Sequence, residues 1–465
     1  SGGHNVTLYD WQCFMNFADF HFKKNSKKTI VLYASPEGQG DDCSKQHPGS
    51  LISVRNKVRS MLASMSQNIV VNLRGGTYRL ESTFKLSHED SGKNGFTVTW
   101  QAYPNEIPVL SGGKPITGWT LYDPKSNIWK TNVGSSSQFR QLYVNGVRAI
   151  RARTPNMTCY LDNGPYNRIF RWNNFHPVIA ASLLANVSNH GQIEFCVNKY
   201  WQHFRYRIGS YSLKGDSTVL SFQMPEAGIS PQFINDNAPF ILENAFEFLD
   251  AEGEWYLESG NGDLYYKPRR GEDMSKSQVI APVLETIMNL EGTPSSTVHH
   301  LRFKGITFEH SNWLGPNERG YTCAQAAIGM VIPGMVEVSN ANHVIFERNC
   351  FKHAGGYGLV LKPFSNFNAI IGNAITDISA NGLVIDPTFY QGDSQVRKDK
   401  AYPWMVSEES MPNLSAGSNY DVVKNNLIEF CGRDYRDAVG IYASFPNHLL
   451  IEHNEIRNLP YSGIS

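Results

Sequence analysis

The stretch Val344-Ile-Phe-Glu-Arg-Asn349-Cys-Phe recurs three times further along the chain. The later copies are Ala369-Ile-Ile-Gly-Asn373-Ala-Ile, Val422-Val-Lys-Asn-Asn426-Leu-Ile and Leu450-Ile-Glu-His-Asn454-Glu-Ile, and Leu301-Arg-Phe-Lys-Gly305-Ile-Thr-Phe precedes them with Gly in place of Asn. The asparagines follow one another by 24, 53 and 28 residues. The step of 53 fits either two repeats or one repeat that carries a long insertion.

A period in the twenties built from short apolar β runs is typical of a solenoid. A single repeat cannot bury its apolar face alone, so neighbouring repeats stack into one continuous core. The recurring asparagine fits a ladder at a turn, where each side-chain amide bonds the repeat above and below. The pattern therefore predicts an all-β chain folded as a right-handed parallel β-helix.

Length and composition agree with a solenoid and exclude several classes of partner. The chain has 465 residues, which is long for one compact domain, but a solenoid grows along one axis. Its 42 basic and 42 acidic residues balance, so we expect neither nucleic acid nor an anionic membrane as partner. The seven cysteines form no C-x-x-C pair, and we expect no metal and no cofactor.

Two sequence features favour a secreted glycoprotein. Asn-x-Ser/Thr sequons occur at Asn5, Asn156, Asn186 and Asn413. The cysteines are widely spaced, at positions 13, 43, 159, 196, 323, 350 and 431. Together these features predict an extracellular location with two or three disulfides.

The chain divides into four parts. Residues 1–28 contain an amphipathic pattern over 8–28, which we expect to form a helical cap over the open end of the core. Residues 29–139 hold the first strands of the β-helix and a helical pattern over 50–66.

Two insertions interrupt the repeats. Residues 140–280 show alternating strands with a Gly-Asn-Gly hairpin, which predicts an inserted β-sandwich-like subdomain. Residues 281–465 carry the main coils, with a second insertion at 387–418 whose length is typical of a functional loop.

Short motifs in these parts carry a resemblance over nearly the whole chain. They include Val109-Leu-Ser-Gly-Gly113, Ile116-Thr-Gly-Trp119, Arg140-Gln-Leu-Tyr-Val-Asn-Gly146, Arg151-Ala-Arg-Thr-Pro155, Gly262-Asp-Leu-Tyr-Tyr-Lys-Pro268 and Leu459-Pro-Tyr-Ser-Gly463. Together they resemble secreted β-helix carbohydrate-active proteins, among them lacto-N-biosidase-like and fucosidase/xylanase-like hydrolases. The resemblance implies a β-helix that acts on an oligo- or polysaccharide, while the group contains several activities.

Glycoside hydrolysis needs two carboxyl groups that flank the scissile bond. Aligning the strands that follow each asparagine turn places Lys362, Asp386, Tyr442 and Ser465 in one column. We expect the catalytic groups among Asp386, Asp434, Asp437 and Asp393. Each of these also suits a purely structural role in a turn. Tyr435 and Asp437, before Val-Gly-Ile, resemble a (Glu/Asp)-Tyr-x-x-x-Val-Gly-Ile segment of the related proteins.

Substrate-binding residues are expected beside these carboxylates. Trp313 suits stacking on a sugar, and His310 and Gln325 suit hydrogen bonds to its hydroxyls. The alternative is that Trp313 only caps a repeat over a satisfied His310. Lys362, Tyr435 and Tyr442 complete the set, with Lys362 either steering an acidic sugar or pairing with Asp386.

The leading function is therefore a secreted glycoside hydrolase with paired aspartates. A polysaccharide lyase stays open, because Lys362 could remove a proton beside a uronate carboxylate. A glycan-binding β-helix without turnover is the third possibility. The sequence stops within a strand of the last repeat, at 460–465, and an open coil edge is unfavourable. We therefore expect a second chain or a C-terminal fragment to complete the β-helix.

Overall fold

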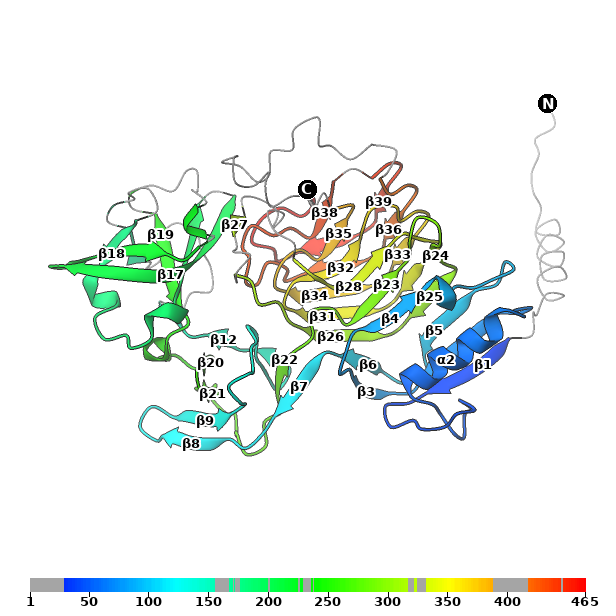
Figure 1. The fold of residues 1–465 in the computed structure, drawn as a ribbon, viewed down its shortest axis with the longest axis horizontal. Coiled ribbons are helices and arrows are strands. Elements are labelled where there is room, and N and C mark those ends of the chain that lie inside the picture. Colours follow the sequence, from blue (N-terminus) through cyan, green and yellow to red (C-terminus); the bar gives the residue numbers. More distant parts are fainter. Residues whose placement is uncertain are drawn as a thin grey trace, which may run out of the picture.

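The computed structural model describes residues 29–154, 167–169, 171, 176–199, 201–224, 226–228, 236, 238–316, 322–323, 332–387, 417–444 and 446–465. Figure 1 shows a stack of β-coils in the centre, a separate group of strands to its left, and one α-helix to its right. The predicted helical cap at 8–28 lies outside the described residues. No helix within them is long and apolar enough to cross a membrane.

Three parallel sheets run along the coil stack, and each complete coil gives one strand to each sheet. The first sheet contains β1 (Ile30–Ala34), β2 (Ile69–Leu73), β5 (Val98–Ala102), β25 (Leu301–Lys304), β30 (Ile345–Glu347), β33 (Ala369–Ile371), β36 (Val422–Lys424) and β39 (Leu450–Glu452). The second contains β3 (Gly76–Arg79), β6 (Pro108–Ser111), β26 (Thr307–Ser311), β31 (Cys350–Ala354), β34 (Ala374–Ile378), β37 (Leu427–Glu429) and β40 (Glu455–Arg457). The third contains β4 (Phe84–Ser87), β23 (Met288–Glu291), β28 (Gly334–Ser339), β32 (Tyr357–Leu361), β35 (Leu383–Ile385) and β38 (Ile441–Ala443).

The expected parallel β-helix is therefore the architecture of the coils, and its right-handed winding stays a prediction. A short parallel pair, β24 (Val298–His299) and β29 (Ala341–Asn342), lies at one turn. Inward-facing side chains from all three sheets form one buried cluster along the stack. Identical residues stack at the coil spacing inside it, as Phe308 does on Phe351 with ring centroids 5.1 Å apart.

The helix α2 (Leu51–Leu62) covers the end of this core beside β1. Ser50 caps it by accepting a hydrogen bond from the backbone N–H of Ser53 at 3.0 Å. Its buried residues, Leu51, Val54, Val58 and Leu62, follow the helical period and join the core of the coils. The helical pattern predicted over 50–66 thus corresponds to α2.

The predicted asparagine ladder is present in the described coils. Asn349 donates from its backbone N–H and its amide to Oδ1 of Asn373, at 2.9 and 3.1 Å. Asn373 bonds Asn426 in the same way, and Asn426 bonds Asn454. Because Asn373 reaches Asn426 directly, the step of 53 residues is one coil with an insertion.

The column predicted across the third sheet is wrong at its last two positions. Strand pairing places Leu383 opposite Ile441, so Val384 faces Tyr442 and Ile385 faces Ala443. Lys362 and Asp386 occupy matching positions, each one residue after its strand, β32 or β35. Tyr442 comes two residues before the matching position after β38. The glycine column Gly358–Gly382–Gly440 sets this register, because a Cβ on Gly382 would lie 2.8 Å from the carbonyl oxygen of Gly440.

The second group of strands interrupts one coil, between β6 and β23. It begins with β7 (Gly113–Ile116) and ends with β22 (Val279–Pro282), which pair with each other and with the hairpin β10 (Tyr143–Val144) and β11 (Val147–Arg148). A second sheet holds β8 (Thr120–Asp123), β9 (Ile128–Asn132), β12 (Ile150–Arg151), β20 (Glu254–Glu258) and β21 (Asp263–Tyr266). The predicted boundary at residue 140 is too late, because β7, β8 and β9 already leave the coil.

Another sheet, separate from the three sheets of the coils, completes the insertion and has its own hydrophobic core. It holds β13 (Arg153–Thr154), β14 (Asn167–Arg168), β15 (Val178–Ala180), β16 (Glu194–Lys199), β17 (Gln202–Lys214), β18 (Ser217–Phe222), β19 (Pro239–Glu243) and β27 (Thr322–Cys323). Short 3-10 turns, η1 (His88–Asp90), η2 (Ala181–Leu183), η3 (His190–Gln192), η4 (Glu226–Gly228) and η5 (Phe246–Phe248), connect strands.

The cysteines do not form the expected set of disulfides. Cys43, Cys196, Cys350 and Cys431 are free thiols in the described part of the chain. They lie on different parts of the fold, so the prediction of two or three disulfides is wrong for these four residues. Of the predicted glycosylation sites, Asn186 is exposed in the insertion, and Asn5, Asn156 and Asn413 lie outside the described residues.

Candidate functional site

A pocket of about 170 Å³ opens where the insertion meets the last coils. The insertion supplies its walls from the segment before β10, from β11 to β13, from β17 and from β19, and the coils supply the segment after β37. The lining residues are Arg140, Gln141, Arg148, Ala149, Ile150, Arg151, Arg153, Arg205, Glu243, Arg433, Asp434 and Arg436. Most of this lining is charged, and it contains the predicted site residue Asp434.

Local turn chemistry brings the two sides together. Asn145 and Gly146 both adopt positive φ, 53° and 75°, as the two-residue turn of the β10–β11 hairpin requires. This hairpin carries Arg148 onto the coils. On the coil side, the backbone N–H of Asp434 donates to the carbonyl oxygen of Ser379 at 3.1 Å, which fixes Asp434 to the coil beneath.

Asp434 is held through one of its two carboxylate oxygens. Its Oδ2 accepts hydrogen bonds from Ser379 Oγ at 2.7 Å and from Gln141 Nε2 and Arg148 at 3.1 Å each. No hydrogen bond from the described residues falls on Oδ1, and the side chain is 22% exposed. Burial alone would raise the pKa of Asp434, but Arg148 and Arg205 lower it well below its usual value. Asp434 is therefore an ionised carboxylate with one oxygen available.

Behind the pocket, buried glutamates hold the arginines in place. Glu194 accepts from Arg140, Arg151 and Arg205, at 2.5, 2.7 and 3.1 Å. Arg205 also pairs with Glu243 at 2.6 Å and donates to the carbonyl oxygen of Asp434 at 2.8 Å. Burial raises the pKa of Glu194, but these guanidinium groups hold it well below its usual range. The network links the insertion to the segment that carries Asp434.

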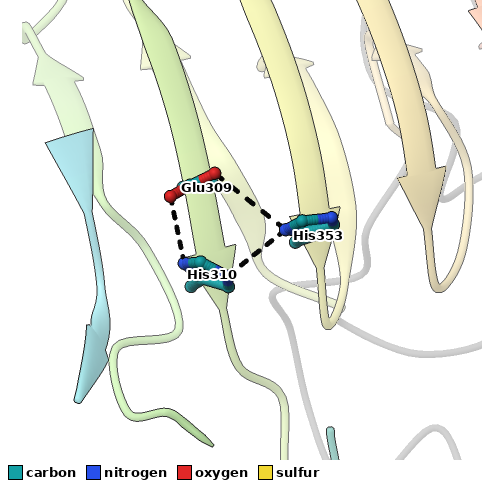
Figure 2. A group of neighbouring side chains, drawn as sticks. All are labelled: Glu309, His310 and His353. Atoms are coloured by element: carbon teal, nitrogen blue, oxygen red, sulfur yellow. Dashed lines mark hydrogen bonds and ion pairs between the residues drawn. The ribbon is translucent and has the colours of Figure 1, made fainter. Parts of the chain in front are cut away.

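Arg148 connects this pocket to a second polar cluster. Its Nε donates to Oδ1 of Asp377 at 2.9 Å, and Oδ2 of Asp377 lies 3.8 Å from Nε2 of His353. His353 Nδ1 is 3.2 Å from His310 Nε2, and Ser111 Oγ is 3.1 Å from His310 Nδ1. Figure 2 shows Glu309 and His310 on one strand facing His353 on the next.

This His–Glu cluster is one of two groups in the described chain with the geometry of a metal site. Neutral imidazoles and a carboxylate suit zinc, and burial lowers the pKa of His310 to about 4. However, Lys352 Nζ already pairs with Glu309 at 3.1 Å, and both His310 nitrogens are hydrogen-bonded. We interpret the cluster as a hydrogen-bonded support for Asp377 and Arg148.

The other such group contains Glu194, Cys196 and Glu243. The Arg205 guanidinium lies between them, because one of its nitrogens contacts all three side chains at 2.6 to 3.2 Å. A fixed organic cation therefore takes the place that a metal ion would need.

A second hollow, of about 370 Å³, lies over the third sheet. Lys362 lines it together with Glu291, Glu337 and Asn340. Lys362 Nζ pairs with Glu337 at 2.6 Å, so the expected alternative of pairing with Asp386 is wrong. This hollow is larger than the arginine-lined pocket, but the predicted aspartates Asp386, Asp434 and Asp437 are not among its lining residues.

The structure separates the predicted aspartates. Asp386 is buried, and its two oxygens accept from the backbone N–H and Oγ of Ser418, at 2.6 and 2.9 Å. It therefore ties together the two ends of the 387–418 insertion, and burial raises its pKa. Asp437 is buried close to Asp434 in sequence, and Asp393 lies outside the described residues.

The predicted substrate-binding residues are mostly internal. Trp313, Tyr435 and Tyr442 belong to one buried cluster over the outer face of the third sheet. Tyr435 donates to the carbonyl oxygen of Gly315 at 3.0 Å, and the Arg205 guanidinium lies 5.5 Å from its ring. His310 is 6% exposed, and its bonds to neighbouring side chains match the alternative of a satisfied histidine. Gln325 lies outside the described residues.

Sequence reasoning missed the arginines and Gln141. Arg140, Arg148, Arg151 and Arg153 lie within 14 residues of sequence. Three of these arginines lie in two of the quoted motifs, and Arg148 lies between those motifs. Their density in a β-rich segment of a chain with no net charge was the available signal.

Comparison with known proteins places this architecture among carbohydrate-active proteins. Residues 126–269 match the model of the GH141 insertion domain. A solved structure titled "Glycoside hydrolase" is 27% identical and superposes with a TM-score of 0.81, covering 94% of this chain and 79% of its own. A comparison with curated proteins found no significant match, whereas twelve chains of solved structures match at the same threshold.

Two further solved structures are more distant. "The complex structure of XylC with xylose" has a TM-score of 0.47 and 12% identity, covering 92% of this chain and 59% of its own. A pectate lyase, Pel9A, has a TM-score of 0.35 and 10% identity, covering 93% and 56%. The insertion-domain match and the first neighbour support a glycoside hydrolase that acts on a carbohydrate. The finer resemblance to lacto-N-biosidases stays a prediction.

Proposed function

We propose that this chain hydrolyses a glycosidic bond in the arginine-lined pocket, with Asp434 as the ionised carboxylate. The observation that carries the proposal is the asymmetry of its bonds. Three donors hold Oδ2, while Oδ1 receives none from the described residues. A carboxylate held in this way is oriented to attack a sugar carbon or to activate water.

The low pKa of Asp434 fits this role, because a nucleophile or base must be ionised before the reaction. Glu243 does not suit the role of the acid, because it pairs with Arg205 at 2.6 Å and with Arg153 at 3.4 Å; burial raises its pKa, but these guanidinium groups lower it overall. Of the aspartates predicted from the sequence, Asp437 and Asp393 remain the candidates for the protonated partner. Arg148 and Gln141 act as positioning residues, because both hold Oδ2 of Asp434.

The test compares hydrolysis by the wild type and by Asp434→Asn on a panel of nitrophenyl glycosides and natural oligosaccharides. Asn keeps the shape but cannot ionise, so we expect kcat to fall by about three orders of magnitude or more. Asp216→Asn, an exposed carboxylate of the insertion, is the control and should keep full activity.

Product chemistry separates the competing functions. New reducing ends without ultraviolet absorbance indicate hydrolysis, whereas an absorbing unsaturated sugar indicates a lyase. Unchanged turnover in Asp434→Asn would contradict the assignment of this residue. Glycan binding without turnover, equal in both proteins, would leave a non-catalytic β-helix. The secreted location is part of the proposal, and unglycosylated Asn186 on protein from a eukaryotic culture medium would remove one of its supports.

A further inference from the structure

The pocket collects positive charge in a chain whose total charge is zero. Seven of its lining residues are arginines, from both the insertion and the coils. Among the described residues, ion pairs tie Arg140, Arg148, Arg151, Arg153, Arg205 and Arg433 to four carboxylates, which are Glu194, Glu243, Asp377 and Asp434. The guanidinium charge in the cluster therefore exceeds the carboxylate charge that these pairs supply.

This excess cannot be removed by titration. A guanidinium group stays protonated in proteins, even when it is buried. The side chains of Arg140 and Arg205 are only 8% and 4% exposed, and those of Arg151 and Arg153 are 13% exposed. Burial of like charges is unfavourable unless an opposite charge lies beside them. The same buried positive charges therefore favour the binding of an anionic ligand in this pocket.

The unfavourable burial of like charges is clearest at Arg151. Burial and the nearby Arg140 lower its pKa, although Glu194 opposes them. An anion that entered the pocket would relieve both effects. Arg433 lies toward solvent, with a side chain 44% exposed, and pairs with Asp377 only at 3.5 Å. Buried arginines at the wall and an exposed arginine at the rim form a path for an anionic group.

The lining also lacks the usual surface for a neutral sugar. None of the twelve described lining residues is aromatic. Neutral sugars are commonly held by stacking on aromatic rings, whereas planar guanidinium forks match carboxylate and sulfate oxygens in pairs. The recognition chemistry is therefore that of an anion.

We propose that the pocket binds an acidic glycan through the anionic substituent of one sugar, a uronate carboxylate or a sulfate ester. The inference rests on the proposed function, and it adds the class of substrate. It places Asp434 beside the anionic sugar, with Arg151, Arg153 and Arg433 as the residues that select its charge.

Calorimetric titration with monosaccharides tests this inference without requiring turnover. The probes are glucuronate and galacturonate, glucose 6-sulfate and galactose 6-sulfate, and neutral glucose and galactose. We expect one acidic series to bind at least tenfold more tightly than its neutral counterpart and to weaken as salt rises. The two acidic series distinguish carboxylate from sulfate.

Arg433→Gln is the variant of choice, because the side chain is 44% exposed and its replacement leaves no cavity in a core. It should weaken the acidic sugar about fivefold to tenfold and leave neutral sugars unchanged. Arg457→Gln is the matched control: its side chain is 51% exposed and pairs with Glu429 outside the pocket. It should change neither. Equal binding of acidic and neutral sugars, or no effect of Arg433→Gln, would overturn the inference.

The outcomes for the two proposals differ. Hydrolysis of neutral glycans with no preference for acidic ones would leave the hydrolase and overturn the anionic substrate. Tight, charge-dependent binding of an acidic sugar, with no hydrolysis of any glycan that carries it, would support the pocket and overturn the hydrolase.

Discussion

At the scale of single residues, the pKa of a buried aspartate depends on the groups that donate hydrogen bonds or positive charge to its carboxylate. Asp434 has guanidinium neighbours and a lowered pKa, while Asp386 accepts hydrogen bonds from Ser418 and has a pKa that burial raises. Asp421 is the extreme case. Its Oδ1 accepts from the backbone N–H of Asn368 at 2.7 Å, but Oδ2 is buried without a hydrogen-bond partner among the described residues. Burial raises the pKa of Asp421 to about 7.

Asp421→Asn should therefore stabilise the protein in a pH-dependent way. The unfolded pKa of an aspartate is about 3.9, so the protonated Asp421 carboxyl costs the native state no stability below pH 4. As pH rises through 7, this group lowers the unfolding free energy, because the unfolded chain ionises it more readily. Asn keeps the acceptor and removes the charge. We expect little change at pH 4 and a gain of about 2–4 kcal/mol in unfolding free energy at pH 8, measured by denaturant titration.

Asp386→Asn is the informative comparison for this prediction. Both oxygens of Asp386 accept hydrogen bonds, so the amide loses one acceptor and the variant should be less stable than the wild type. A loss of stability in Asp421→Asn at pH 8 would show that its buried oxygen is satisfied in solution.

At the scale of elements, the coils were predictable because their signals are local. The asparagine ladder repeats within each short segment, so its spacing could be read directly. The register of the third sheet was missed for a physical reason. Eleven residues, 430–440, separate β37 from β38, whereas four separate β34 from β35. The glycine column through Gly382 and Gly440 marked the true register, because a Cβ there would meet the next backbone.

Asn373→Ala should destabilise the coil stack strongly. Asn373 is fully buried, accepts two hydrogen bonds from Asn349 and donates to the carbonyl oxygen of Phe346 at 3.0 Å. Its removal leaves buried donors and an acceptor unsatisfied, at about 1–3 kcal/mol each. We expect a loss of about 3–5 kcal/mol in unfolding free energy, measured in denaturant.

The end of the same ladder provides the control. Asn454 makes equivalent bonds to Asn426, but it is half-buried, so water can replace them. Asn454→Ala should cost about 1–2 kcal/mol. Equal losses in the two variants would mean that the ladder contributes through local turn geometry, without a contribution from burial.

At the scale of the whole molecule, the site depends on contacts that no local pattern reveals. Arg148 and Asp434 are 286 positions apart, and Gln141 and Asp434 are 293 apart. The sequence located Asp434 on a coil and the arginines in an insertion. It did not indicate that the insertion folds back onto that coil. The candidate pocket exists only through this contact, so its residues could be named singly but not as one site.

The same contact joins the hydrophobic core of the coils to the core around the first insertion strands, which contains Leu142, Val144 and Ala149. Arg148 bridges them with ion pairs to Asp377 and Asp434 and with bonds to the carbonyl oxygens of Ala354 and Asp377. Arg148→Met would leave two carboxylates without this partner, which costs about 3–5 kcal/mol for buried pairs. We therefore expect calorimetry of the variant to show the insertion unfolding at a lower temperature, with the coil transition nearly unchanged.

The effect of Arg148→Met should also depend on pH. The pKa of Asp434 is lowered in the native state, so its ion pair stabilises the protein above about pH 4 and is lost as pH falls further. The difference between wild type and variant should shrink accordingly below pH 4. Lys424→Met removes a half-exposed ion pair with Glu452 on the coil surface. It should change the unfolding free energy of neither transition by more than about 1 kcal/mol. If Arg148→Met lowered both transitions equally, the insertion and the coils would unfold as one cooperative unit, and the pocket would be part of a single rigid body.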